Sequence, residues 1–202
     1  MRVLLARRDS EIAAGATSIG WKVGLNGPAI QAHLGLDGPV VGYLTDATLL
    51  DPADPVDIGG WTHPALEVEV AVRVGDDGGV AALGPALELV DLHLPFDRVG
   101  PVLADNVVHR GVILGPEQAG LDPTGLRVQV ERGPELVVAG HLAEPPGVTV
   151  AEVRQFLRAH GAEMRAGDRI IAGSLIPPLA VSPGDRFHID FGVLGTLDVG
   201  FC

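Results

Sequence analysis

The sequence predicts an α+β fold that is mostly β and contains a few short helices. Its 28 glycines and 16 prolines are scattered without a repeating period, which is typical of short strands joined by tight turns. The clearest periodic segment, Leu66–Val74, alternates apolar residues with others as a strand does. Hydrophobic residues make up 47 %, enough to fill a core, and no linker divides the chain. We therefore expect one domain over residues 1–202.

The first part of the chain predicts short elements. Residues 1–15 are rich in helix formers and predict the tail of a helix, which Gly15 can end. Gly20–Gly24 predicts a short strand with a glycine at each end. Gly27 and Pro28 mark the start of a two-turn helix, which Gly35 ends.

The middle of the chain predicts two strands in succession. In Leu66–Val74 every second residue is apolar, so Glu67 and Glu69 fall together on the opposite face. Asp76–Gly79 has the composition of a turn, and Gly84–Leu94 follows as a second ordered apolar stretch.

The last part predicts one helix among several strands. Thr149–His160 carries an apolar stripe, and Thr149 with Glu152 has the spacing of a capping box. The segments expected to form strands are Val107–Leu114, Leu126–Val130, Leu136–Ala139, Ile170–Leu179, Arg186–Phe191 and Thr196–Phe201.

Charge and cysteine content exclude several classes of protein. The chain has 26 acidic and 14 basic residues, a net charge of −12, so neither nucleic acid nor an anionic membrane surface is an expected partner. The single cysteine, Cys202, excludes an internal disulfide and a cysteine-based zinc site. No apolar run approaches the roughly 18 residues of a membrane helix, and the N-terminus is too short a match for a signal peptide. We expect a cytoplasmic protein.

Three glutamates are candidates for metal chemistry. Glu67 and Glu69 share one strand face, so their carboxylates lie roughly 6–7 Å apart and repel unless a cation or proton sits between them. Mg²⁺ favours such oxygen ligands. The alternative is a strand whose polar side simply faces solvent. Glu88 stands among apolar neighbours, where an acid is paired, liganded or turned outward, and Asp91 is a competing acid nearby.

Lys22 is a candidate for proton transfer. It lies in a glycine-flanked strand between Trp21 and Val23, and the pKa of a lysine falls when the ammonium is desolvated. The alternative is an edge-strand lysine that discourages aggregation. The seven histidines follow no metal-binding spacing, and we expect most of them to be structural or exposed. The sequence contains no motif typical of serine hydrolases, of P-loop nucleoside triphosphatases or of dinucleotide-binding proteins.

Six segments, in order, span nearly the whole chain: Gly20–Leu44 (GWKVGLNGPAIQAHLGLDGPVVGYL), Leu66–Val72 (LEVEVAV), Ala86–Asp91 (ALELVD), Leu103–Asn106 (LADN), Arg165–Leu175 (RAGDRIIAGSL) and Pro183–Phe201 (PGDRFHIDFGVLGTLDVGF). Together they resemble the 2-keto-4-pentenoate hydratase and 4-oxalocrotonate decarboxylase branch of the fumarylacetoacetate hydrolase superfamily.

The resemblance implies a fumarylacetoacetate-hydrolase-like β-roll and a site for Mg²⁺ or Mn²⁺. By position, the metal ligands are Glu67, Glu69 and Glu88, and Lys22 is the catalytic lysine. The substrate-facing positions are Asn26, Asn106, Ser174 and Leu175. Relatives assemble as homo-oligomers, so the same is expected here.

The resemblance also implies a small 2-oxo or 2-hydroxydienoic acid as substrate, in aromatic catabolism. The expected reaction is hydration of a 2-hydroxy-2,4-dienoate to a 4-hydroxy-2-oxo acid. Decarboxylation of a 4-oxalocrotonate-type acid is the second candidate, followed by hydrolysis of an acylpyruvate C–C bond. A catalytically silent subunit that binds a keto acid or a partner is the last.

The chain departs from the family pattern at four places, the first of which is the N-terminal helical segment over residues 1–15, which is abbreviated. Val40 and Val41 stand where relatives carry an acid, so a second acid–base group is expected to be missing. His93 stands where relatives carry an arginine. The link between Glu69 and Glu88 is short, with a four-residue turn where relatives have an additional helical segment.

Overall fold

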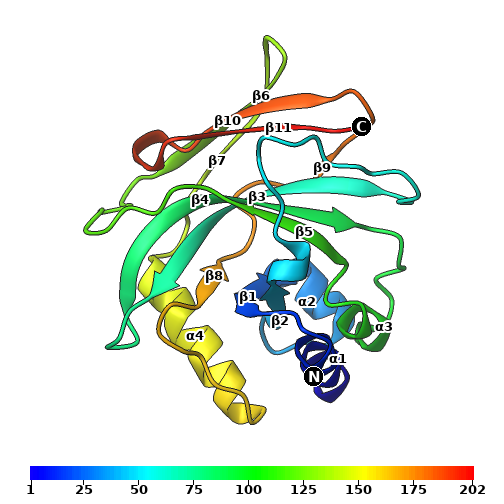
Figure 1. Cartoon of the computed structure of the whole chain (residues 1–202), viewed down its shortest axis with the longest axis vertical. Coiled ribbons are helices and arrows are strands. Elements are labelled where there is room, and N and C mark those ends of the chain that lie inside the picture. The colour runs from blue at the N-terminus through cyan, green and yellow to red at the C-terminus, as the bar shows by residue number, and fades with distance from the viewer.

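Two β-sheets carry most of the chain in the computed structural model, which describes residues 1–202 (Figure 1). The larger sheet runs in the order β2-β1-β8-β3-β4-β5, with β9 paired to β3. Its strands are β1 (Ser18–Gly24), β2 (Val40–Thr45), β3 (Pro64–Val74), β4 (Val80–Asp91), β5 (His109–Leu114), β8 (Arg169–Ile171) and β9 (Leu179–Ala180). The smaller sheet has the order β11-β10-β6-β7, with β6 (Arg127–Arg132), β7 (Glu135–His141), β10 (Arg186–Asp190) and β11 (Thr196–Gly200).

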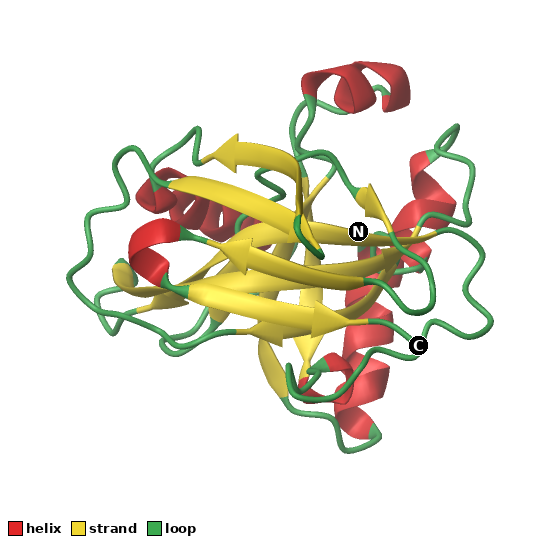
Figure 2. Cartoon of the chain, turned by 90° about the horizontal axis from the view of Figure 1, so that it is seen from above, coloured by secondary structure: helices red, strands yellow, loops and turns green.

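Helices lie around the sheets, and Figure 2 shows them at the periphery of the strands. They are α1 (Arg2–Ala13), α2 (Pro28–Leu34), α3 (Val99–Ala104) and α4 (Pro146–Ala159), with 3₁₀ turns η1 (Asp46–Thr48) and η2 (Gly192–Leu194). Helix α1 packs against α3 and β2, whereas α4 packs against β2, β3 and β4. The mostly β architecture with a curled sheet confirms the predicted fold class.

The β3–β4 hairpin is the centre of the molecule. Its alternating pattern sends the apolar side chains of β3, from Leu66 to Val72, into the core, where they are fully buried. Glu67 and Glu69 point to the other face, as predicted. Strand β4 is longer than expected and begins at Val80, because the turn before it is tight enough for pairing to start at once.

Glycine and proline residues interrupt Ile170–Leu179, which we expected to be a single strand. Between β8 and β9 the chain leaves the sheet at Gly173, whose φ of +95° suits glycine alone, and Pro177 and Pro178 cannot donate ladder hydrogen bonds. Residues 172–178 form a loop, and its Gly173 N–H reaches Glu69.

The predicted capping box of the last helix is wrong. Helix α4 begins at Pro146, and no side chain caps its N-terminus. Proline at the first helical position lacks the N–H that would otherwise need a partner, so the helix starts one turn earlier than Thr149. Thr149 is buried on the helix instead.

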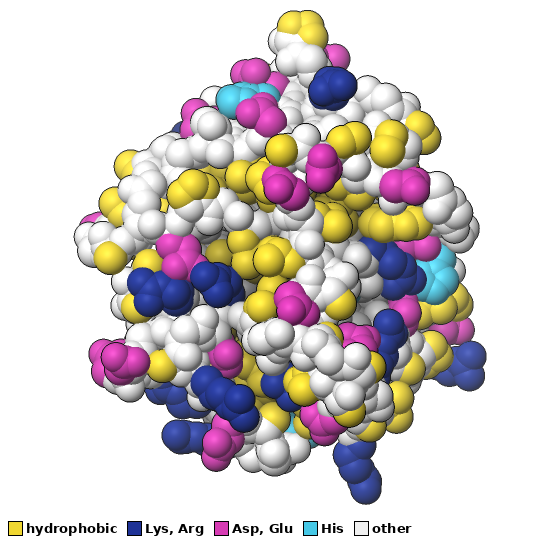
Figure 3. Space-filling model, in the orientation of Figure 1, with side chains coloured by type: hydrophobic (Ala, Val, Ile, Leu, Met, Phe, Trp, Pro, Cys, Tyr) yellow, Lys and Arg dark blue, Asp and Glu magenta, His cyan; other side chains and the backbone are white.

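The core extends between both sheets and α4, and a smaller apolar cluster lies on the glutamate-bearing face. Val40 and Val41, at the position of the missing acid, are both buried in β2 as part of the main core. Acidic and basic side chains are interspersed over the face shown in Figure 3. None of the helices is long and apolar enough to cross a membrane.

Candidate metal centre and adjoining cavity

Glu67, Glu69 and Glu88 lie together on one face of the β3–β4 hairpin. The register places Glu67 directly opposite Glu88, and Glu69 follows two residues along the same face. One carboxylate oxygen from each lies within 4.8 Å of the others. Glu69 and Glu88 are fully buried and Glu67 is half-buried, so the solvent-facing alternative is wrong.

Each buried carboxylate is held at one oxygen only. Glu88 Oε1 forms an ion pair with Lys22 Nζ and a hydrogen bond with His109 Nδ1 at 2.8 Å. Glu69 Oε2 accepts a hydrogen bond of 2.8 Å from the backbone N–H of Gly173. The other oxygens, Glu88 Oε2 and Glu69 Oε1, are buried and have no hydrogen-bond partner. Such orphaned oxygens are costly unless a ligand contacts them.

Burial and mutual repulsion change the acidity of the cluster. Burial, with the nearby charge of Glu88, raises the pKa of Glu67 to about 7. The same two causes raise the pKa of Glu69 well above its ordinary value. Burial also acts to raise the pKa of Glu88, but the Lys22 ammonium and the His109 hydrogen bond outweigh it and lower that pKa. Three carboxylates thus share one ammonium, and the site lacks positive charge.

Lys22 is buried in the larger sheet rather than at its edge. Strand β1 lies between β2 and β8, and Lys22 is only 1 % exposed, so the edge-strand alternative is wrong. Its ammonium pairs with Glu88 and donates a 3.2 Å hydrogen bond to the carbonyl of Val107. In this structure Lys22 therefore holds Glu88 in place.

A turn in the left-handed conformation positions the Val107 carbonyl beside the Lys22 ammonium. Asn106, Val107 and Val108 have φ values of 50°, 56° and 58°, a conformation that costs roughly 1–2 kcal/mol for each residue with a side chain. The Asn106 amide accepts a 3.0 Å hydrogen bond from the Tyr43 N–H and donates one of 2.9 Å to the Tyr43 carbonyl. Asn106, expected to face substrate, is buried and instead fastens this turn to β2, which also explains why β5 begins at His109.

His109 is the site residue that sequence reasoning missed. Its ring is buried, with Nδ1 on Glu88 and Nε2 3.1 Å from Thr48 Oγ1. Burial lowers the pKa of His109, although the Glu88 contact opposes the shift. The histidine gave no spacing signal because it reaches Glu88 only through the pairing of β4 with β5.

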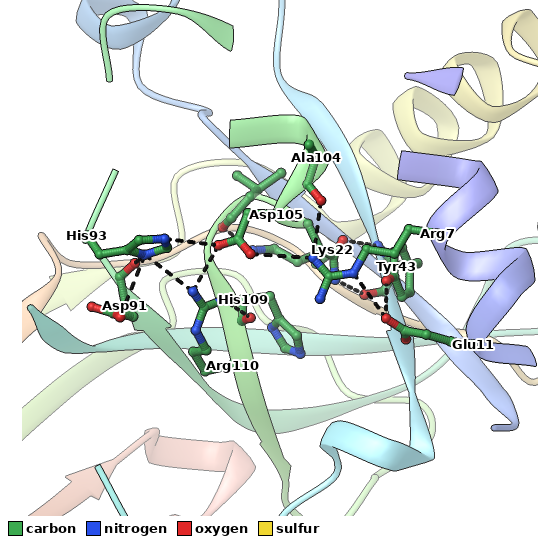
Figure 4. A network of polar contacts seen from close by, with 12 residues as sticks. Arg7, Glu11, Lys22, Tyr43, Asp91, His93, Ala104, Asp105, His109 and Arg110 are labelled. Atoms are coloured by element: carbon green, nitrogen blue, oxygen red, sulfur yellow. Dashed lines mark hydrogen bonds and ion pairs between the residues drawn. The ribbon is translucent and has the colours of Figure 1, made fainter. Parts of the chain in front are cut away.

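A second polar network flanks this site, and Figure 4 shows it. Asp105 binds Arg110 at 2.9 Å and Arg7 of α1 at 3.4 Å, and Arg110 also contacts His93 at 3.3 Å. Asp91, the acid that competed with Glu88 in the sequence, accepts hydrogen bonds from the backbone N–H groups of Thr62 and His63. It lies outside the glutamate cluster.

Gly42 provides the space in which Lys22 and Asn106 meet. A Cβ at Gly42 would lie 2.7 Å from Lys22 Cγ and 2.8 Å from Asn106 Oδ1. We expect Gly42→Ala to lower the free energy of unfolding by about 1–3 kcal/mol through overpacking. Gly38→Ala is the matched control, because no atom lies within 4 Å of that position. Urea denaturation measures both, and equal stability of the two variants would contradict this packing.

A cavity of about 560 Å³ opens beside the cluster and reaches it at Glu67. Asn26, Ser174 and Leu175, three of the predicted substrate-facing residues, line it. Ser174 Oγ donates to the Ile176 carbonyl at 2.8 Å and accepts from the Val68 N–H at 3.3 Å. The carboxylate cluster and the cavity together form a site that can bind a cation and a small organic molecule side by side.

Curated proteins of similar sequence cover nearly the whole chain. A 4-oxalocrotonate decarboxylase from Pseudomonas putida is 29 % identical over 98 % of this chain and 81 % of its own length. A 2-keto-4-pentenoate hydratase from Dechloromonas aromatica (strain RCB) is 29 % identical over 94 % of this chain and 80 % of its own length. No family model matches the sequence.

Solved structures share the fold. The 4-oxalocrotonate decarboxylase of Pseudomonas putida G7, complexed with magnesium and adipate, superimposes with a TM-score of 0.88 at 25 % identity, over 98 % of this chain and 83 % of that one. A fumarylacetoacetate hydrolase family protein from Yersinia pestis CO92 has a TM-score of 0.65 at 18 % identity, over 92 % of this chain and 94 % of that one. These relatives confirm the resemblance of the chain to the 2-keto-4-pentenoate hydratase and 4-oxalocrotonate decarboxylase branch of the fumarylacetoacetate hydrolase superfamily.

Proposed function

We propose that this chain is a divalent-metal-dependent lyase that hydrates a 2-hydroxy-2,4-dienoate to a 4-hydroxy-2-oxo acid. One observation carries the proposal: two buried carboxylate oxygens, on Glu69 and Glu88, have no partner, and a third carboxylate, Glu67, joins them to a cavity. The similarity to hydratases and decarboxylases of this family supports the same class of reaction.

The donor set fits Mg²⁺ or Mn²⁺, with Glu67, Glu69 and Glu88 as ligands. Hard divalent cations prefer oxygen, and a cation here would offset the surplus negative charge of the cluster. When bound, such an ion supplies a Lewis acid that stabilises charge on the C2 oxygen of a 2-oxo acid.

The surrounding residues orient the carboxylates. Lys22 and His109 hold Glu88 at Oε1, and the Gly173 N–H holds Glu69 at Oε2, so the free oxygens of both are fixed in direction. We assign proton transfer to Lys22 Nζ. Lys22 contacts Glu88 and, like Glu88, does not line the cavity in this structure.

The reaction balances as two proton movements and one addition of water. Ketonisation moves the proton of the C2 hydroxyl to C5, which leaves a double bond between C3 and C4. Water then adds its hydroxyl to C4 and its proton to C3. Asn26 and Ser174 contribute the polar side chains of the cavity besides Glu67, and we propose that they orient the substrate.

Decarboxylation is the second candidate, because a 4-oxalocrotonate decarboxylase is among the relatives that match most of the chain. Stabilisation of charge at the C2 oxygen also permits loss of CO₂ from a distal carboxylate. The buried Val40 and Val41, in place of an acid, keep this simpler reaction as the alternative to hydration.

Incubation with 2-hydroxypenta-2,4-dienoate tests the proposal. We expect loss of the dienol absorbance with Mg²⁺, no loss with excess chelator, and recovery when Mg²⁺ is restored. Product analysis identifies the reaction: a 4-hydroxy-2-oxo acid indicates hydration, CO₂ from a dienedioate indicates decarboxylation, and pyruvate with a free acid indicates hydrolysis. No metal-dependent loss at high protein concentration would contradict the lyase assignment.

We further propose that the protein acts in the cytoplasm as a homo-oligomer. Light scattering of the purified protein measures the oligomeric state directly, and a mass equal to the 20.9 kDa chain would contradict it.

A further inference from the structure

The lining of the cavity beside Glu67 contains no cationic side chain. Its polar side chains are Glu67, Asn26 and Ser174. The rest is apolar and includes Ile30, Leu92 and Phe96. A molecule in this cavity meets a negative cluster at one place and hydrocarbon over most of the remaining wall.

The basic side chains near the cavity already have polar partners. Lys22 is buried against Glu88, and Arg110 is bound to Asp105 at 2.9 Å and to the His109 carbonyl at 2.8 Å. His93, which follows the lining residue Leu92, contacts the backbone oxygen of Asp91 at 2.9 Å and lies beside Arg110. None of these groups lines the cavity.

A second carboxylate on the substrate would therefore contact this wall without a counter-charge. An unpaired buried charge costs several kcal/mol, and the glutamate cluster adds repulsion. An apolar substituent instead gains free energy from the same wall. The cavity volume of about 560 Å³ is within the range of small-molecule sites and leaves room for a chain longer than five carbons.

Building on the function proposed above, we propose that the cavity selects 2-oxo and 2-hydroxydienoic acids with a single carboxylate and an apolar distal end. Acids with a distal carboxylate are rejected. Within the family reaction classes, this places the substrate among the monocarboxylic dienoates and not among the dienedioates.

The selectivity for the distal end can be measured by binding alone, with two six-carbon acids that undergo no hydration. With Mn²⁺ present, titration calorimetry compares 2-oxohexanoate with 2-oxohexanedioate, which share the 2-oxo acid group and differ at the distal end. We expect the monocarboxylic acid to bind at least about 10-fold more tightly, as expected for a substituent that suits or opposes an apolar pocket. Equal or tighter binding of 2-oxohexanedioate would overturn the inference.

Introducing a cation into the cavity wall should have the opposite effect on the binding preference. Phe96→Arg places a guanidinium in the wall and should reduce or reverse the preference, whereas Phe96→Leu keeps the wall apolar and should preserve it. Leu136→Arg is the charge control, because Leu136 is exposed on β7 and outside the cavity. A preference unchanged in Phe96→Arg would show that this wall does not contact the distal end, and would overturn the inference.

The test of selectivity and the test of the proposed lyase function can fail independently of each other. If the monocarboxylic acid is preferred but no dienol is consumed, the lyase assignment fails and the selectivity stands. If dienols are consumed and the dienedioate is preferred, the lyase assignment stands and the selectivity fails.

Discussion

Replacing Glu69 with glutamine is expected to reduce the affinity for Mn²⁺ by more than about 100-fold. Groups that merely support a metal ligand cost 10–100-fold when changed, and Glu69 is proposed as a ligand itself. The substitution keeps the shape of the side chain and removes its charge. Titration calorimetry measures the affinity, and Glu135→Gln, on the exposed start of β7, is the matched control.

The same variant has an opposite effect on the metal-free protein. Glu69 is fully buried beside two other carboxylates, which raises its pKa, so near neutral pH it destabilises the fold through desolvation and repulsion. In the presence of chelator, Glu69→Gln should therefore unfold at a higher temperature than the wild type. The gain should shrink as the pH falls towards 4.5 and disappear below it, where the wild-type carboxyl is protonated in both the folded and the unfolded state. A less stable variant would mean that the metal affinity was lost through misfolding.

Replacing Lys22 with methionine is expected to lower the free energy of unfolding by about 3–5 kcal/mol, the usual effect of removing one partner of a buried ion pair. Glu88 is fully buried and would keep only His109 as a partner. Urea denaturation measures the loss. The Lys22→Met, Glu88→Gln double variant should recover most of it, because no uncompensated charge is then buried.

Two results would contradict this role of Lys22. One is a Lys22→Met variant as stable as the wild type, and the other is a double variant no more stable than Lys22→Met. If Lys22 also transfers a proton, kcat for the dienol should fall by about 10²–10⁴-fold in Lys22→Met at saturating Mn²⁺.

The period of two in β3 made the shared face of Glu67 and Glu69 predictable from sequence. The turn at Asp76–Gly79 was also readable, and a tight turn fixes which residues of the two strands are opposite each other. The meeting of Glu67 with Glu88 was therefore within reach of sequence reasoning once the strand pairing is known.

The residues that hold the glutamates in place could not be predicted in the same way. Valine disfavours positive φ, so nothing local indicates that Val107 and Val108 adopt it. The turn is stabilised by contacts distant in sequence, among them those of Asn106 with Tyr43 and of Lys22 with the Val107 carbonyl. His109 depends on that turn and on a strand pairing distant in sequence. The loop that brings the Gly173 N–H to Glu69 was hidden inside an apolar segment that resembles a strand.

Anomalous scattering from crystals grown with Mn²⁺ tests the metal centre most directly. We expect one strong peak per chain, within coordination distance of carboxylate oxygens from Glu67, Glu69 and Glu88. No peak there at saturating Mn²⁺, or a peak bound by other residues, would contradict it.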